Sequence, residues 1–167
     1  MTIKYIEKGH GLHGAIASAG YNLREENGAW VADDEAAVQA IIDRYTVADA
    51  AAAVCALIDG EARRLRDKAV KSISPGEMAS WPVKRAEAER YLATGEAADA
   101  PMLAAEAESR GVTLAAVADR VKTAADRFSR LEAEISGTAG RHKDAVRAAT
   151  SFEAVAAYDW STGWPAV

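Results

Sequence analysis

The sequence has a single cysteine and no long apolar run. Cys55 lies among alanine, valine and leucine, which excludes an intrachain disulfide and favours a buried thiol over a reactive one. No stretch reaches the roughly 20 apolar residues that a membrane-spanning helix needs. The first residues lack a charged leader followed by an apolar core. We therefore expect a protein made and kept, at least at first, in a cytosol, with no membrane partner.

Aromatic residues are scarce as well. They make up 7% of the chain, although 50% of its residues are hydrophobic, and much of the hydrophobic fraction is alanine. A core built from such residues needs closely spaced helices, because each side chain contributes little volume. We expect thin cores of this kind to gain part of their stability from association, and therefore a homo-oligomer.

No region concentrates charge of one sign. The formal net charge of -5 comes from acids and bases interleaved along the chain, without the basic run that follows a phosphate backbone. Trp81 and Lys84 could stack on a nucleic acid base, but Glu87 and Glu89 cancel the field that would attract phosphates. Nucleic acid is therefore not expected as a partner.

The first 46 residues predict a small helix, hairpin, helix module. Leu12 to Ala19 has helical spacing and stops at Gly20, a residue suited to a helix C-terminus. Asn27-Gly28 lies between short apolar-polar runs, the best local signal for a tight β-hairpin. Asp33 and Asp34 can then cap a helix. The inner face of that helix is formed by apolar residues at helical spacing: Val38, Ile41, Ile42 and Tyr45.

From Thr46 onward the pattern is helical. A long helix with apolar positions from Val54 to Ile73 is expected to end at Ser74-Pro75, which also begins the next helix. Pro82 predicts a kink or a late start in that second helix, and Thr94-Gly95 closes it. A linker over 96–101 then precedes a short helix over 102–110, which stops at Gly111.

The C-terminal half carries the strongest pattern, a three-four alternation of apolar residues. They are Leu114, Val117, Val121, Ala124, Phe128, Leu131 and Ile135. Thr113 caps this helix, which is expected to end between Gly137 and Gly140, before a further helical stretch over 145–149. A seam of this kind packs against other helices, and both a bundle within the chain and a coiled coil between copies stay open.

These patterns predict a mainly α fold, a helical bundle with a heptad helix and a small N-terminal α+β module. The expected divisions are the N-terminal module over 1–46, the bundle or coiled-coil region over 47–150 and an irregular tail over 151–167. Trp160 and Trp164 lie in the tail. Two free tryptophan rings in water are unfavourable, so we expect them to dock on this chain or on a partner.

No group of residues predicts catalysis, a metal or a cofactor. His10 and His13 are three residues apart and could share a metal, but a structural site normally needs four ligands and the flanking glycines indicate a loop. The acids at 33–35 are better explained by the preference of a helix N-terminus for negative charge. The glycines lack the preceding strand and following Lys-Ser/Thr pair of a phosphate loop, and the serines lack a glycine elbow.

Several motifs resemble those of small tail proteins of phages and prophages. The resemblance covers roughly residues 54 to 149 and follows the order of the motifs along the chain. They are Trp81, Lys84, Glu87, Ala88 and Tyr91 on one helix, then Pro101-Met102-Leu103, then Ala107 to Leu114, and finally a long helix ending in Ile135-Ser136-Gly137. Segments of the N-terminal module, such as Gly11-Leu12-His13 and Asn27 to Val31, are also similar to the N-terminal part of some of these proteins.

The resemblance implies a non-enzymatic structural or assembly component, associated with the tail fibre or tail tip. It would occur in the host cytoplasm during assembly and, as a structural component, in the virion tail. Two alternatives stay open: a fibre assembly chaperone that leaves before the virion is complete, and a phage-encoded regulatory protein that binds a host factor. The residues expected to make the contacts are Leu114, Val121, Phe128, Leu131 and Ile135 in the seam, with Trp160 and Trp164 in the tail.

Overall fold

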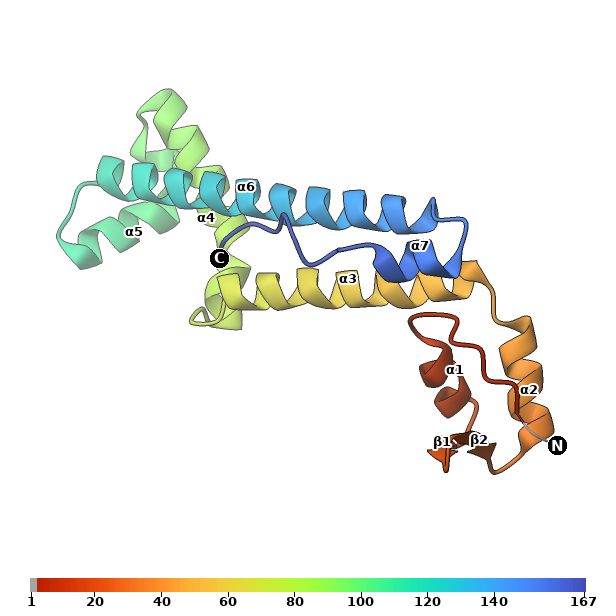
Figure 1. The fold of residues 1–167 in the computed structure, drawn as a ribbon. Helices are drawn as coiled ribbons and strands as arrows, with labels where there is room; N and C mark the ends of the chain where they lie inside the picture. Colours follow the sequence, from red (N-terminus) through yellow and green to blue (C-terminus); the bar gives the residue numbers. More distant parts are fainter. Residues whose placement is uncertain (1–2) are drawn as a thin grey trace. The chain divides into compact units, whose positions relative to one another are not determined.

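The computed structural model describes residues 3–167 and is mainly α (Figure 1). Its residues are 68% helical and its two strands form one hairpin near the N-terminus, which confirms the predicted fold class. The chain divides into two compact units. Unit 1 comprises the residues up to Arg64 together with Ser136–Trp164, and unit 2 comprises Leu65–Ile135 with Pro165–Val167. The predicted divisions after residues 46 and 150 stay a prediction.

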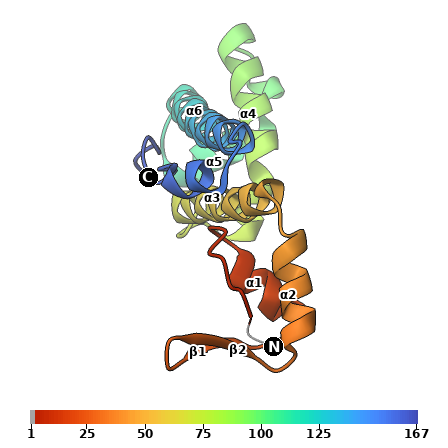
Figure 2. The same ribbon diagram turned by 45° about the vertical axis from the view of Figure 1, so that its right-hand side comes forward.

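The N-terminal part of unit 1 has four short elements, which Figure 2 shows with the two strands side by side. They are α1 (Leu12–Ser18), β1 (Leu23–Glu26), β2 (Ala29–Ala32) and α2 (Glu35–Arg44). The strands are antiparallel, and Glu26 is opposite Ala29, so the loop consists of Asn27 and Gly28 alone. Both turn residues have positive φ, 53° and 79°, as a tight Asn-Gly hairpin requires. The predicted hairpin is confirmed.

Helix α2 has a hydrogen-bonding partner at each end. Asp34 is the N-cap and accepts a hydrogen bond of 2.9 Å from the backbone N–H of Ala37, as predicted. At the other end, Lys8 Nζ donates to the carbonyl oxygens of Ile42 and Tyr45, at 2.6 and 3.2 Å. A cation at the C-terminus of a helix satisfies unpaired carbonyls and opposes the negative end of the dipole.

The loop before α1 approaches helix α3 (Val47–Ala69) closely at Gly11. A Cβ atom there would lie 2.4 Å from the Cβ of Ala53 and 2.8 Å from the hydroxyl of Tyr45, and Gly11 has φ of +92°. The Tyr45 hydroxyl also donates to the carbonyl oxygen of His10 at 2.6 Å. Only glycine meets both the steric and the conformational requirement at this position.

The C-terminal part of unit 1 differs from the prediction. Helix α6 (Leu114–Arg147) continues through Gly137 and Gly140, so the predicted end there and the separate stretch over 145–149 are wrong. A glycine costs a helix only about 1 kcal/mol relative to alanine, and burial along one side opposes that cost. The buried residues of this part of α6 are Ala139, His142 and Val146.

The tail is also more ordered than expected. It begins with a short helix, α7 (Phe152–Ala157), where an irregular chain was predicted. Ser151 accepts a hydrogen bond from the N–H of Ala154, and Val155 is buried. The Phe152 ring lies nearly parallel to that of Tyr45, with 6.2 Å between the ring centroids. These contacts favour helix formation in a segment too short to show a periodic pattern.

Unit 2 contains the end of α3, the first part of α6 and three elements between them. These are α4 (Pro75–Thr94), the single-turn 3-10 helix η1 (Ala97–Asp99) and α5 (Pro101–Arg110). Ser74 caps α4 by accepting the N–H of Glu77, and Gly95 ends it with positive φ, as predicted. A late start at Pro82 is wrong, because the Ser74 cap already fixes the first turn. The long helix α3 ends at Ala69 and not at Ile73, because the chain must turn before it reaches the Ser74 cap.

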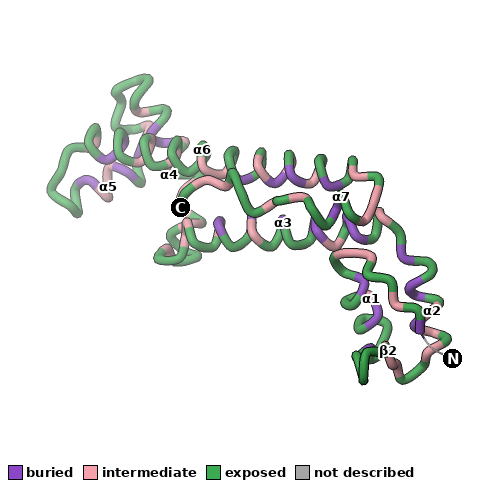
Figure 3. The backbone as a smooth tube through the Cα atoms, in the orientation of Figure 1, coloured by how far each residue is buried: buried purple, intermediate pink, exposed green. Residues whose placement is uncertain are grey.

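Alanine dominates the unit 2 core. Buried residues, purple in Figure 3, recur along the helices, and this core is one cluster of six. Its members are Ala88, Ala100, Leu103, Ala107, Val117 and Ala118, with Tyr91, Leu114 and Val121 packed against them. Small side chains let helices approach closely but bury little apolar surface per residue. The predicted thin core is therefore confirmed here, and other contacts must contribute to fixing the helix positions.

We predict that Gly11→Ala lowers the free energy of unfolding by about 3 kcal/mol, since the new methyl group overlaps Ala53 and the left-handed φ is strained. Gly14→Ala is the matched control, because Gly14 lies within α1 and a Cβ there has no atom within 4 Å. It should leave stability unchanged or raise it. Urea unfolding followed by circular dichroism measures both, and equal midpoints for the two variants would contradict the packing described for Gly11.

Candidate interaction surface

The predicted α6 seam is covered at its two ends and open between them. Leu114 and Val121 pack against the unit 2 core, and Ile135 is 1% exposed. Phe128 is 38% exposed and Leu131 is half-buried. The first part of the seam therefore packs within the chain, as expected for a helical bundle rather than for a coiled coil between copies. Whether the open part binds another chain stays a prediction.

Phe128 meets an aromatic residue of α4. Its ring lies edge to face with Trp81, with 5.4 Å between centroids, a favourable geometry for aromatic pairs. Next to this pair, Arg85 donates to Ser129 at 3.0 Å and to Glu89 at 2.9 Å. The pair connects α4 to α6 while it leaves part of the Phe128 ring accessible to solvent.

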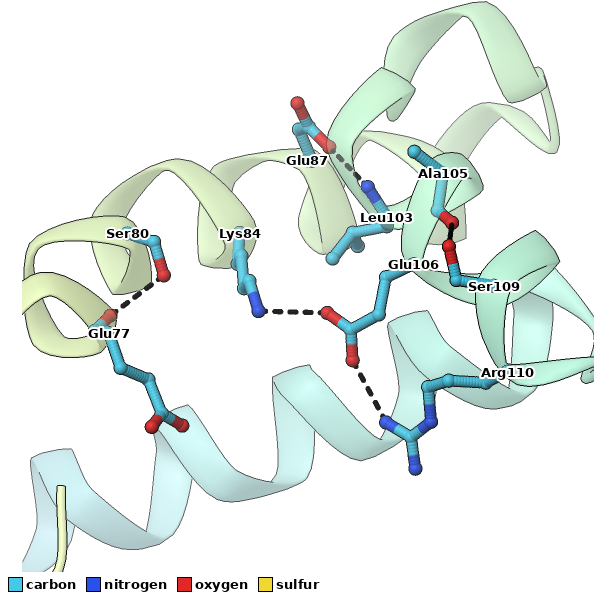
Figure 4. Close-up of polar contacts among 9 residues, drawn as sticks. All are labelled: Glu77, Ser80, Lys84, Glu87, Leu103, Ala105, Glu106, Ser109 and Arg110. Atoms are coloured by element: carbon cyan, nitrogen blue, oxygen red, sulfur yellow. Dashed lines mark hydrogen bonds and ion pairs between the residues drawn. The ribbon is translucent and has the colours of Figure 1, made fainter. Parts of the chain in front are cut away.

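An ion-pair network joins α4 to α5 (Figure 4). Glu106 accepts from Lys84 at 2.8 Å and from Arg110 at 2.9 Å. The hydrogen bond from Lys84, followed by that from Arg110, lowers the pKa of the Glu106 carboxyl below its usual 4.5. One carboxylate thus pairs with two cations, Lys84 on α4 and Arg110, which lies one turn further along α5.

A second carboxylate, that of Glu87, caps the N-terminus of α5. Glu87 is 4% exposed, and its Oε2 accepts a hydrogen bond of 3.0 Å from the backbone N–H of Leu103 (Figure 4). The N-cap residue of α5, Ala100, has no polar side chain, and Pro101 has no N–H to offer. The cap therefore comes from another helix, and a negative charge is favourable at this end of the dipole.

Sequence reasoning missed this role of Glu87, although a signal was present. Glu87 falls on the same side of α4 as Trp81, Lys84, Ala88 and Tyr91, and this position predicts that its carboxylate is buried. The Ala-Pro start of the next helix lacks a capping side chain. A buried Glu87 needs a hydrogen-bond donor, and the start of α5 needs an acceptor, so the two features together predict the contact.

The two tail tryptophans lie half-buried on unit 1. The Trp164 ring centroid is 5.7 Å from that of His142, and its Nε1 donates to the carbonyl oxygen of Trp160 at 2.9 Å. Nearby, the hydroxyl of Thr138 donates to the carbonyl oxygen of Gly163 at 3.3 Å. The tail thus docks on its own chain, one of the two arrangements expected for these rings.

His142 is the centre of this tail contact and was also missed. It is 3% exposed, with Nε2 at 2.9 Å from the carbonyl oxygen of Thr162 and Nδ1 at 2.7 Å from the Tyr158 hydroxyl. Because the Thr162 carbonyl oxygen can only accept, Nε2 of the neutral imidazole carries the proton. Nδ1 then accepts a hydrogen bond from the Tyr158 hydroxyl. A single histidine within a helical pattern does not indicate partners as distant in sequence as Tyr158 and Thr162.

The weaker candidate sites have ordinary structural roles. His10 and His13 are exposed, Asp34 is the α2 cap, and Asp33 accepts from Asn22 at 2.8 Å. Within residues 3–167 no group of three or more histidines, cysteines and acids could hold a metal. Cys55 is buried, as interpreted from its neighbours.

Unit 2 also exposes large apolar side chains. Among the described residues seven large hydrophobic residues are exposed, and five of them lie in unit 2. These five, called here the unit 2 apolar positions, are Val83, Leu92, Met102, Val112 and Phe128. Val83 lies roughly 140° around α4 from the buried Ala88, at 100° per residue. Apolar residues thus occur on more than one side of α4.

Comparisons with known proteins found no relative of this chain. No protein-family model matches it, and neither a curated protein nor a solved structure is significantly similar to it. Across the part of the chain that is described, none of the helices combines the length and apolar character needed to cross a membrane.

We predict that Glu106→Gln lowers stability by about 0.5 kcal/mol at neutral pH, the usual size for a partly exposed ion pair. Because folding lowers this pKa, the contribution of Glu106 is present above its unfolded value of 4.5 and lost as the pH falls through the folded value. The difference between variant and wild type should therefore vanish in acid. Urea unfolding across this pH range measures it, and Glu108→Gln, at an exposed acid of the same helix, is the control. A difference that persists in acid would refute the assignment.

Proposed function

We propose that this protein is a non-enzymatic phage tail protein. It acts as a structural or assembly component at the tail fibre or tail tip, through helical packing against another protein. The motif resemblance supports the phage assignment, and the residues that carry it lie mainly on α4, α5 and α6. The observation that carries the binding role is the set of unit 2 apolar positions, which lie on or beside the same helices.

The exposure of these residues supports a partner that covers them. A helix that is apolar on several sides is normally buried in its complete assembly. Val83 and Leu92 on α4 are each 47% exposed. Met102, in the first turn of α5, and Val112, just after the end of that helix, are each 40% exposed. Aromatic residues, phenylalanine among them, are enriched in the cores of protein interfaces, so the exposed Phe128 ring suits a binding role.

Two alternatives use the same exposed residues. A fibre assembly chaperone would bind through it and then leave, and a phage-encoded regulatory protein would present it to a host factor. The acidic net charge of -5 suits a small protein that binds a basic site on such a factor. The three roles differ in the partner and in the final location of the protein, which an experiment can separate.

The test is co-expression with the tail fibre protein of the same phage, with the mass of the complex measured by light scattering behind a sizing column. We expect a defined complex that Val83→Asp with Leu92→Asp weakens at least about tenfold, the usual effect of removing interface anchors. Leu57→Asp is the matched control, because Leu57 is 45% exposed but lies on α3 in unit 1. It should leave the complex intact.

Mass spectrometry of purified virions then distinguishes the roles. The protein remains in the virion if it is a structural component and is absent from it if it is a chaperone. A protein that never binds the fibre protein, or a complex equally weakened by Leu57→Asp, would contradict a binding role for the unit 2 apolar positions. All three substitutions replace exposed side chains, so unchanged circular dichroism is expected and serves as the folding check.

A further inference from the structure

Unit 1 has a shallow groove on the N-terminal part of α3. Its volume is about 380 Å³, within the range of sites that take a small ligand or a protein side chain. Four alanines and Cys55 form most of its lining, and Asp59 and Arg147 contribute charge. The groove is therefore apolar, and its charged lining comes from α3 and from the end of α6.

The charge of this groove is unbalanced. Lys143 forms an ion pair with Asp59 at 2.8 Å, so the acid of the groove is already neutralised. The acid paired with Arg147 among residues 3–167 is a distant one, Asp144 at 4.0 Å, and both side chains are largely exposed, 62% and 82%. A pair at that distance in water is worth very little. An occupant that places a carboxylate beside Arg147 would complement the groove.

The chain itself presents a segment with matching properties. Ile6 is 62% exposed, the most exposed large hydrophobic residue of the described chain, and it lies before α1 in a segment without regular secondary structure. Glu7 follows it and is also exposed. An apolar side chain next to a carboxylate matches an apolar groove next to a guanidinium.

We propose that Ile6 and Glu7 of one copy bind the α3 groove of a second copy. The Ile6 side chain enters the alanine-lined groove, and the Glu7 carboxylate pairs with Arg147. The contact removes exposed apolar surface from both copies and gives Arg147 a close partner. This self-association uses only unit 1, so it does not depend on the proposed function or on the unit 2 apolar positions.

The association is expected to be weak on its own. One side chain in a shallow groove buries far less than the roughly 1,600 Å² of a standard protein interface. A dissociation constant on the order of 100 µM is therefore reasonable for the isolated protein. If the two contacts form reciprocally, the product is a closed dimer; otherwise copies add head to tail.

The test is sedimentation equilibrium of the full chain at concentrations up to about 1 mM, above the expected dissociation constant. Ile6→Asp and Arg147→Glu should each raise the dissociation constant at least about tenfold. A double variant, Glu7→Arg with Arg147→Glu, reverses both charges and should restore most of the association. This rescue distinguishes a direct contact from damage to the fold.

Two controls use exposed residues outside the contact. Val83→Asp alters an exposed apolar side chain in unit 2, and Arg63→Glu alters an exposed arginine on α3. Neither should change the dissociation constant. A monomer at every concentration would overturn the proposal. Association that Ile6→Asp leaves unchanged, or that the double variant fails to restore, would also overturn it. None of these results bears on binding to the fibre protein.

Discussion

The contact between the Glu87 carboxylate and the N-terminus of α5 is the interaction on which unit 2 depends. Four of the six residues in the unit 2 core are alanine, so apolar burial brings α4, α5 and α6 close together without specifying their orientation. A hydrogen bond to a buried charge is directional and costly to break. Glu87 binds one atom, the N–H of Leu103, and so fixes where α5 begins on α4. The partly buried network around Glu106 adds to this at a second point.

Specific polar contacts also fix the segments of unit 1. Lys8 donates to the last carbonyls of α2, and Tyr45 fixes the loop at His10, where Gly11 permits close approach to α3. His142 fixes the tail through both ring nitrogens. In a chain rich in alanine, polar groups with specific partners thus decide which apolar surfaces are covered. The surfaces they leave open are the ones proposed to bind other proteins.

Local signals predicted much of this fold, and contacts between distant residues account for the rest. Asn27-Gly28 and Gly95 act through their own backbone conformations, so sequence sufficed to place the hairpin and the end of α4. Gly137 was misjudged, because the contacts that keep α6 helical come from elsewhere in the chain. The seam residues were correctly identified as helical, but their exposure depends on where α4 and α5 lie. Residues such as His142 have partners that no local pattern specifies.

Amide hydrogen exchange at Leu103, measured by NMR, tests the central claim most directly. Amides in the first turn of a helix normally exchange quickly because they lack intrahelical partners. We predict that the Leu103 amide, bound to buried Glu87, exchanges roughly tenfold to hundredfold more slowly than the neighbouring Met102 amide, the factor that corresponds to a hydrogen bond to a charged group. Equal rates for the two amides, after correction for intrinsic differences, would show that Glu87 does not hold the start of α5.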